Sequence, residues 1–103
     1  YLETSGSAIL AFSILRGVRL GFLPESYRQY GVKAFEGIQN RYMKTTDGKL
    51  HLGGICLVAG LGPADNTRRD GSFAYYMSEP VVEDDAKGVA PFLLAYTELR
   101  RLD

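Results

Sequence analysis

A helix that is apolar on nearly every side is the feature that most restricts the fold of this chain. Over residues 5–20 the only charged side chains are Arg16 and Arg19, near the end, and apolar side chains occupy the whole circumference: Ala8, Ile9, Ala11, Phe12, Ile14, Leu15 and Val18. Such a helix is buried all round. Gly21 is expected to end it. We therefore predict an inner helix that other elements surround.

The first turn of this helix is built from small and hydroxyl residues, Thr4, Ser5, Gly6 and Ser7. Hydroxyl side chains can cap free backbone N–H groups. Small residues also let another backbone or a ligand come close. We expect close packing or ligand contact at this end of the helix.

A second helix is predicted from Pro24 onward, and this one is amphipathic. Apolar side chains recur at three- and four-residue spacing, opposite a polar face: Tyr27, Tyr30, Ala34, Phe35, Ile38 and Tyr42. Pro24 suits the first turn. An inner helix followed by an outer helix with one wet face is the pair from which α/α barrels are built by repetition, whereas a four-helix bundle would show two amphipathic helices. The expected fold class is mainly α.

The helical period disappears between Thr45 and Val82. Asp47-Gly48 is a turn signal, and residues 50–58 have the character of short strands. A compact domain seldom carries so much irregular chain unless the segment lines a site or packs on a neighbouring piece. The alternative is a surface hairpin without a role.

A last helix is predicted after Glu83-Asp84-Asp85, which supply an N-cap and negative charge, and it runs to Leu102. Pro91 is awkward within it. Either the first turn is kinked there, or the regular helix begins near Ala90 with Pro91 in its first turn.

Composition excludes several classes of protein. Twelve basic residues balance twelve acidic ones, and the two signs are interspersed, so neither a nucleic acid nor a membrane surface is an expected partner. No run of apolar residues is long enough to span a membrane. Cys56 is the single cysteine, which excludes an intrachain disulfide. With 46% hydrophobic residues in 103, we expect one ordered unit, residues 1–103.

The residue types that carry chemistry are sparse. His51 is the only histidine, and no acidic residue stands at a convincing ligand spacing to it, so we predict neither a metal site nor a serine nucleophile. Glu79 and the acids at positions 83–85 could form the carboxylate pair of a glycosidase, but helix capping explains the acids more simply. Lys87 opposes the helix dipole, and we expect it to pair with a carboxylate of the chain or of a substrate.

Three aromatic residues of the irregular stretch leave two interpretations open. Phe73, Tyr75 and Tyr76 could stack on sugar rings, or they could be buried as alternate residues of a short strand.

Four segments resemble a known family when they are read as strings in this order: residues 3–8 (ETSGSA), 56–62 (CLVAGLG), 69–80 (RDGSFAYYMSEP) and 87–95 (KGVAPFLLA). They resemble the C-terminal third of glycoside hydrolase family 105, the unsaturated rhamnogalacturonyl hydrolases, which are related to the unsaturated glucuronyl hydrolases of family 88. The resemblance implies the C-terminal segment of an (α/α)6 barrel. It also implies that the chain starts inside a longer protein.

The resemblance implies a bacterial enzyme of pectin degradation that removes a 4,5-unsaturated uronic acid from the non-reducing end of an oligosaccharide, without a metal or organic cofactor. An Asp acts as general acid and base in the family. That Asp belongs to the N-terminal portion and has no counterpart here, so we assign no catalytic residue and expect the isolated chain to be inactive. The compartment, cytoplasm or periplasm, and the sugar beneath the unsaturated residue stay open.

The same resemblance suggests where substrate would bind. Sugars lie at one end of the inner helices of such barrels, and the first and last helices of this chain resemble inner ones. Because helix N-termini attract carboxylates, the candidates for the pocket wall are Thr4, Ser5, Lys87 and Gly88. Two positions depart from the pattern expected for the family, which has Asn at Asp84 and Gly at Ala90.

A second hypothesis is a small helical module that binds a protein partner or assembles with itself. The first helix separates the two hypotheses, because it needs more neighbours than one outer and one terminal helix supply. We therefore expect either self-association of the chain or cover from a missing N-terminal portion.

Overall fold

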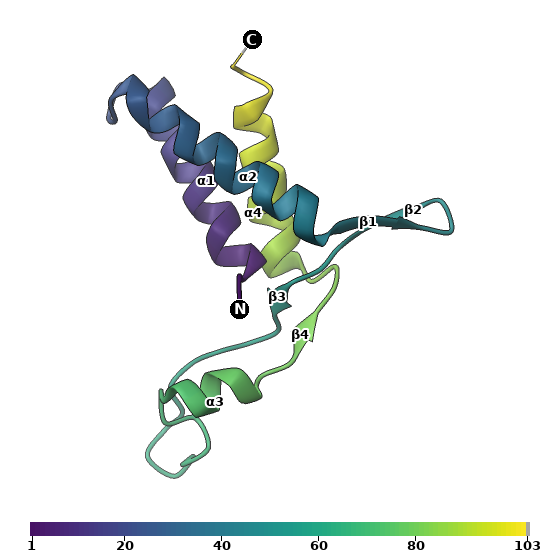
Figure 1. The fold of residues 1–103 in the computed structure, drawn as a ribbon. Helices are drawn as coiled ribbons and strands as arrows, with labels where there is room; N and C mark the ends of the chain where they lie inside the picture. The colour runs from purple at the N-terminus through teal and green to yellow at the C-terminus, as the bar shows by residue number, and fades with distance from the viewer. Residues whose placement is uncertain (103) are drawn as a thin grey trace.

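The structure is a computed structural model and describes residues 1–102. Helices dominate, and the strands are short (Figure 1). The elements in chain order are α1 (Thr4–Arg19), the 3-10 helix η1 (Glu25–Tyr27), α2 (Arg28–Tyr42), β1 (Met43–Thr46), β2 (Lys49–Leu52), β3 (Ile55–Cys56), α3 (Phe73–Ser78), β4 (Val81–Val82) and α4 (Ala86–Leu99).

Helices α1 and α4 lie side by side and run in the same direction (Figure 1). Their first turns meet at residues 53–55, just before and in β3, where the Thr4 amide donates to the Gly54 carbonyl at 2.8 Å. Their last turns are joined by an ion pair between Arg19 and Glu98. Helix α2 runs in the opposite direction across them. The parallel pair and the opposed helix are consistent with the predicted two inner helices and one outer helix of an α/α barrel.

The core lies where these three helices meet. Small residues on α1 and α4 let their backbones approach closely, since Ala8, Ala11 and Ala95 are all fully buried. Phe35 of α2 stacks on Phe92 of α4 with ring centroids 4.7 Å apart. A stacked pair of this kind adds about 0.5–1.5 kcal/mol beyond the burial of its area. It fixes the outer helix against α4.

The first helix is not covered on all sides within residues 1–102, as expected for a helix that needs more neighbours than one outer and one terminal helix supply. Ile9 and Leu10 are 50% and 61% exposed, and Leu93 and Leu94 of α4 are also exposed. The physical reason is that α2 and α4 cover only part of the surface of α1. Despite these apolar side chains, none of the helices within residues 1–102 is long and apolar enough to cross a membrane.

The apolar face of the second helix is narrower than the spacing predicted. Phe35 and Ile38 are buried, but Tyr27 and Tyr30 are exposed. These two tyrosines contact each other edge to face, with centroids 6.0 Å apart, at the end of the helix that extends beyond the core.

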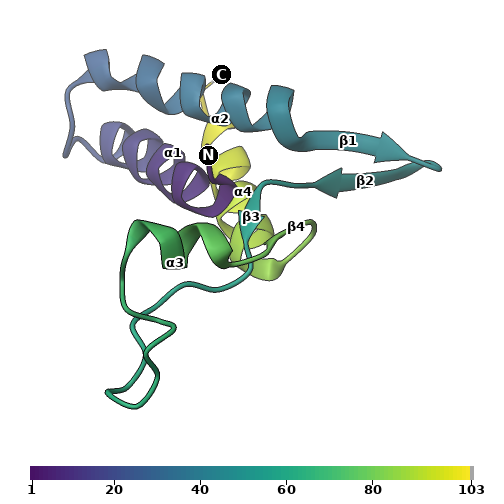
Figure 2. The same ribbon diagram turned by 60° about the horizontal axis from the view of Figure 1, so that its bottom comes forward.

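The predicted turn at Asp47-Gly48 is confirmed as the tip of the β1–β2 hairpin, whose register pairs Met43 with Leu52 and Thr46 with Lys49. Both turn residues have positive φ, 52° and 73°, as a type I′ turn requires. The hairpin projects from the end of α2 (Figure 2).

A second excursion, residues 57–80, leaves and returns through the β3–β4 ladder, where Ile55 pairs with Val82 and Cys56 with Val81. Sequence analysis predicted no helix in this segment, but the structure has a short one, α3. The Ser72 hydroxyl accepts from the Tyr75 amide at 3.1 Å and caps α3. The strand interpretation of Phe73, Tyr75 and Tyr76 is therefore wrong.

The start of α4 follows the predicted cap. Asp85 is the N-cap, and its carboxylate accepts from the Lys87 amide at 2.9 Å. Pro91 is buried inside the helix, so the alternative start near Ala90 is wrong. The helix ends at Leu99, three residues before the predicted Leu102.

The Arg19–Glu98 pair yields a stability prediction. Glu98 is 3% exposed, and its two carboxylate oxygens accept from Arg19 Nε at 2.7 Å and Nη2 at 2.9 Å. Arg19→Gln leaves a buried carboxylate without its main cation, so we expect unfolding in urea to become easier by about 2–3 kcal/mol. The matched control is Arg28→Gln, which removes an exposed pair with Glu25 and is expected to cost about 0.5 kcal/mol or less.

The same pair predicts a pH dependence with a definite sign. The hydrogen bonds from Arg19 hold the pKa of Glu98 below its ordinary value, against the effect of burial. The stabilisation is therefore complete above the unfolded pKa of about 4.3 and is lost as the pH falls through the folded pKa. The difference between wild type and Arg19→Gln should shrink in acid. A difference that stays constant or grows as the pH falls would contradict this assignment.

Candidate functional site

Thr4 joins the N-terminal end of α1 to the segment before β3. Its side chain is fully buried, and its hydroxyl donates to the Gly53 carbonyl at 2.6 Å while its amide donates to Gly54. Sequence analysis assigned Thr4 to the wall of a substrate pocket. In the structure its polar groups are engaged with the chain itself.

Gly54 allows the chain to pass between α1 and Tyr42. Its φ is +70°, and a Cβ at this position would lie 2.5 Å from the Tyr42 ring. The Tyr42 hydroxyl in turn donates to the Leu2 carbonyl at 2.5 Å. This glycine is required for a close approach beside the first turn of α1.

Glu3 is the N-cap of α1, a role that sequence analysis missed. Its carboxylate accepts from the Gly6 amide at 2.7 Å, the Cys56 amide at 2.9 Å and the Ser5 hydroxyl at 2.8 Å. Burial by itself would raise the pKa of Glu3, but these hydrogen bonds outweigh it and leave the pKa below its ordinary value. The half-buried Ser5 is thus held by the cap of its own helix.

The first turn of α4 combines a buried glycine with an exposed lysine. A Cβ on Gly88 would lie 2.5 Å from the Cδ1 and Cγ1 atoms of Ile55, so this glycine permits α4 to contact β3. Lys87 is 57% exposed, and its ammonium lies 2.8 Å from an Asp85 carboxylate oxygen. The carboxylate partner predicted for Lys87 is therefore present in the chain.

The structure places all four predicted site residues at one end of the helix pair. Thr4 and Gly88 are buried in contacts with residues 53–55, whereas Ser5 is half-buried and Lys87 is exposed. Contact of these residues with a substrate stays a prediction. Ser5 and Lys87 retain surface for it.

Each of the acids considered as a glycosidase pair has a basic side chain as its partner. Glu79 lies 2.9 Å from Arg68, Glu83 lies 2.6 Å from Lys44, Asp84 pairs with His51, and Asp85 pairs with Lys87. Hydrogen bonds from His51 and from Lys87 lower the pKa values of Asp84 and Asp85, respectively. A general acid needs a raised pKa. The geometry supports capping and ion pairing for these acids.

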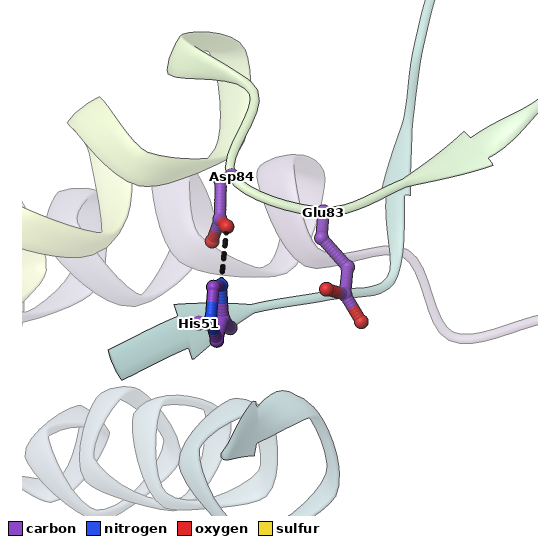
Figure 3. A group of neighbouring side chains, drawn as sticks. All are labelled: His51, Glu83 and Asp84. Atoms are coloured by element: carbon purple, nitrogen blue, oxygen red, sulfur yellow. Dashed lines mark hydrogen bonds and ion pairs between the residues drawn. The ribbon is translucent and has the colours of Figure 1, made fainter. Parts of the chain in front are cut away.

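His51, Glu83 and Asp84 form a group whose ligand atoms all lie within 4.8 Å of one another. Sequence analysis did not expect acids beside His51. Figure 3 shows the Asp84 carboxylate directed at the His51 ring, and Nδ1 lies 2.7 Å from Oδ2. The other Asp84 oxygen accepts from the Leu52 amide at 2.8 Å.

This group has the donor types that a divalent cation accepts, but its atoms are already engaged. Glu83 is neutralised by Lys44, and Asp84 holds the hairpin to the start of α4 from a backbone with φ of 62°. We assign the group a structural role as the clamp between β2 and α4.

The chain belongs to glycosyl hydrolase family 88, whose model matches residues 1–103. It is similar to a solved glycoside hydrolase of family 105 from C. acetobutylicum ATCC 824, with 50% identity and a TM-score of 0.90 over 99% of this chain and 28% of that one. It is also similar to a possible member of the same family from Salmonella enterica, with 29% identity and a TM-score of 0.76 over 98% of this chain and 23% of that one.

Among curated proteins, Protein Atu3128 of Agrobacterium fabrum is 43% identical over 95% of this chain and 44% of its own length. The chain therefore spans less than half of this relative. The similarities confirm the predicted family and the predicted fold class, a mainly helical part of an α/α barrel.

The contact between Gly88 and Ile55 can be tested by substitution. Gly88→Ala places a methyl group where Ile55 lies, so we expect a loss of about 1–3 kcal/mol in the free energy of unfolding. The loss should be smaller in an Ile55→Ala background, as a double-mutant cycle would show.

The matched control for this substitution is Gly37→Ala in α2, where a Cβ meets nothing within 4 Å. It is expected to stabilise the chain by about 0.5–1 kcal/mol through helix propensity. If Gly88→Ala behaves like Gly37→Ala in urea unfolding, the close contact at β3 is absent.

Proposed function

We propose that this chain is part of a hydrolase that removes 4,5-unsaturated uronic acid from the non-reducing end of rhamnogalacturonan-derived oligosaccharides. The observation that carries the proposal is the match of the whole chain to family 88, together with 50% identity to a family 105 glycoside hydrolase. The four segments that resemble unsaturated rhamnogalacturonyl hydrolases support the finer substrate assignment.

The proposed reaction is hydration of the double bond. A general acid delivers a proton to C4 of the C4=C5 vinyl ether, water adds at C5, and the resulting hemiketal opens and releases the shorter sugar. The acids of this chain at positions 79 and 83–85 are paired with basic side chains, so we assign the proton transfer to a residue outside residues 1–103. The isolated chain is accordingly inactive in this proposal.

The role proposed for the chain is to supply part of the pocket wall at the shared N-terminal end of α1 and α4. Thr4 and Gly88 fix the positions of the two helix ends, and Ser5 and Lys87 face the substrate. Helix N-termini and a lysine both favour a carboxylate. The unsaturated uronic acid carries one.

A second candidate function is an interaction module, which the exposed apolar side chains of α1 and α4 favour: Ile9, Leu10, Leu93 and Leu94. In this alternative a partner protein or a second copy of the chain covers the same face that further barrel helices cover in the first proposal.

A hybrid protein tests the enzymatic proposal. Residues 1–103 replace the matching segment of the C. acetobutylicum glycoside hydrolase, and loss of ultraviolet absorbance reports consumption of the double bond in an unsaturated galacturonyl-rhamnose. We expect turnover by the hybrid and by the parent enzyme, and none by the isolated chain. Turnover by the isolated chain, or a folded hybrid that leaves untouched the substrate its parent consumes, would contradict the proposal.

The lysine is tested in the same hybrid. Lys87→Gln removes the positive charge beside the proposed carboxylate site, so we expect KM to rise about tenfold, which corresponds to about 1.4 kcal/mol. Lys33→Gln on the exposed face of α2 is the matched control and should leave KM unchanged.

A further inference from the structure

We propose that Arg68 and Arg69 form a second anion site, which binds the carboxylate of a uronate residue farther along the oligosaccharide. The inference rests on the proposed function for the identity of the ligand. The site lies in the excursion of residues 57–80 and is separate from the helix ends that carry Ser5 and Lys87.

Two guanidinium groups share one buried carboxylate in this excursion. Glu79 is 5% exposed, and its Oε1 lies 2.9 Å from Arg68 Nη2 and 3.7 Å from Arg69 Nη2. One arginine suffices to neutralise Glu79, so the cluster keeps a net positive charge. Asp70, the next residue, accepts from the Ser72 amide and forms no ion pair with either arginine within the described part of the chain.

The surroundings of Glu79 favour its ionised form. Burial would raise its pKa, but the Tyr75 side chain, the Arg68 hydrogen bond and the charges of both arginines outweigh that effect and lower the pKa below its ordinary value. The carboxylate therefore acts as a fixed anchor for the two guanidinium groups.

Arg68 is oriented from a second side by an aromatic ring. Its guanidinium carbon lies 5.5 Å from the centroid of Tyr75, whose own side chain is buried and whose hydroxyl accepts from the Gly60 amide at 3.3 Å. A flexible side chain is thus held between a ring and a carboxylate. Preorganisation of this kind reduces the entropy lost when a ligand binds.

Arg68 nevertheless has N–H donors left to bind a ligand. Its side chain is 58% exposed, and Glu79 engages one of the five N–H donors of the guanidinium group in the described residues. A planar guanidinium binds a carboxylate through two parallel N–H···O bonds. The chemistry matches a uronate better than a neutral sugar.

The excursion lies next to the N-terminal end of α1 in both views (Figures 1 and 2). Tyr76 of α3 stacks on Tyr1 with ring centroids 5.8 Å apart, and the Cys56 amide donates to Glu3. An oligosaccharide that extends outward from the proposed pocket would pass this excursion. A rhamnogalacturonan fragment presents further galacturonate carboxylates along its length.

Calorimetry with saturated trigalacturonate tests the site on the 103-residue chain. We expect binding that weakens about fivefold in Arg68→Gln and in Arg69→Gln and that falls with added salt. Arg68→Lys keeps a positive charge beside Glu79 but loses the planar guanidinium group. This variant should also bind trigalacturonate more weakly, although its unfolding should match that of the wild type. The matched control is Arg28→Gln, which removes an arginine paired with Glu25 outside the excursion and should change nothing.

Control variants and control ligands show whether trigalacturonate binds at the two arginines. Lys33→Gln, on the exposed face of α2, should preserve trigalacturonate binding, since the ligand is held in the excursion. Neutral maltotriose should not bind, and inorganic phosphate should bind more weakly than trigalacturonate. No binding at about 1 mM trigalacturonate, equal binding of maltotriose or phosphate, or unchanged binding by all three arginine variants overturns the proposal.

The outcome of the trigalacturonate binding experiment does not depend on enzymatic turnover. Trigalacturonate lacks the double bond, so its binding does not require the chemistry assigned to the family. A turnover-competent hybrid whose chain does not bind trigalacturonate would remove this site and leave the proposed function standing. Trigalacturonate binding by the chain, together with a folded hybrid that shows no turnover, would keep this site and remove the proposed function.

Discussion

The contact between α1 and α4 is the interaction on which the rest of this structure depends. Alanines at its centre bring the two helices close together, the Arg19–Glu98 pair joins their last turns, and residues 53–55 join their first turns. Because both ends are fixed, the helices must run parallel. Their N-termini therefore share one end, and the excursion of residues 57–80 is attached at that end through β3 and Tyr1. The position of the candidate site follows from this pairing.

The electrostatics of the chain suit the binding of an acidic sugar and not the donation of a proton. The acids at positions 79 and 83–85 are paired with basic side chains, and the pKa values of Glu79, Asp84 and Asp85 are lowered, which is the opposite of what a general acid requires. The helix ends and the Arg68–Arg69 cluster instead offer positive charge, and Lys87, which is paired with Asp85, lies exposed at the start of α4. In our proposal the chain recognises an acidic sugar while another part of the protein supplies the proton. The chain spans 28% of the length of the solved family 105 hydrolase.

Local signals in the sequence predicted the elements that depend on neighbouring residues. The Asp47-Gly48 turn and the Asp85 cap follow from the conformational preferences of those residues, and the helices α1, α2 and α4 follow from their spacing. Long-range contacts were not predictable in this way. The pairing of His51 with Asp84, the closeness of Gly88 to Ile55 and the bond from Cys56 to Glu3 join residues that only the fold brings together. The short helix α3 was missed because its six residues are too few to show a period.

The central claim of this account is that the apolar surfaces of α1 and α4 need neighbours which residues 1–102 do not supply. An apolar groove between α2, the β1–β2 hairpin and α4 is also open, lined by Phe35, Met43, Leu50, Phe92, Leu93 and Tyr96. Exposed apolar surface of this extent drives association in water.

Light scattering of the purified 103-residue chain, with mass determined across a dilution series, tests the claim most directly. The account predicts dimers or larger species that persist on dilution and that decrease when Ile9, Leu10, Leu93 and Leu94 are replaced by Gln. A folded monomer at every concentration would contradict it, because the three helices would then form a closed unit by themselves.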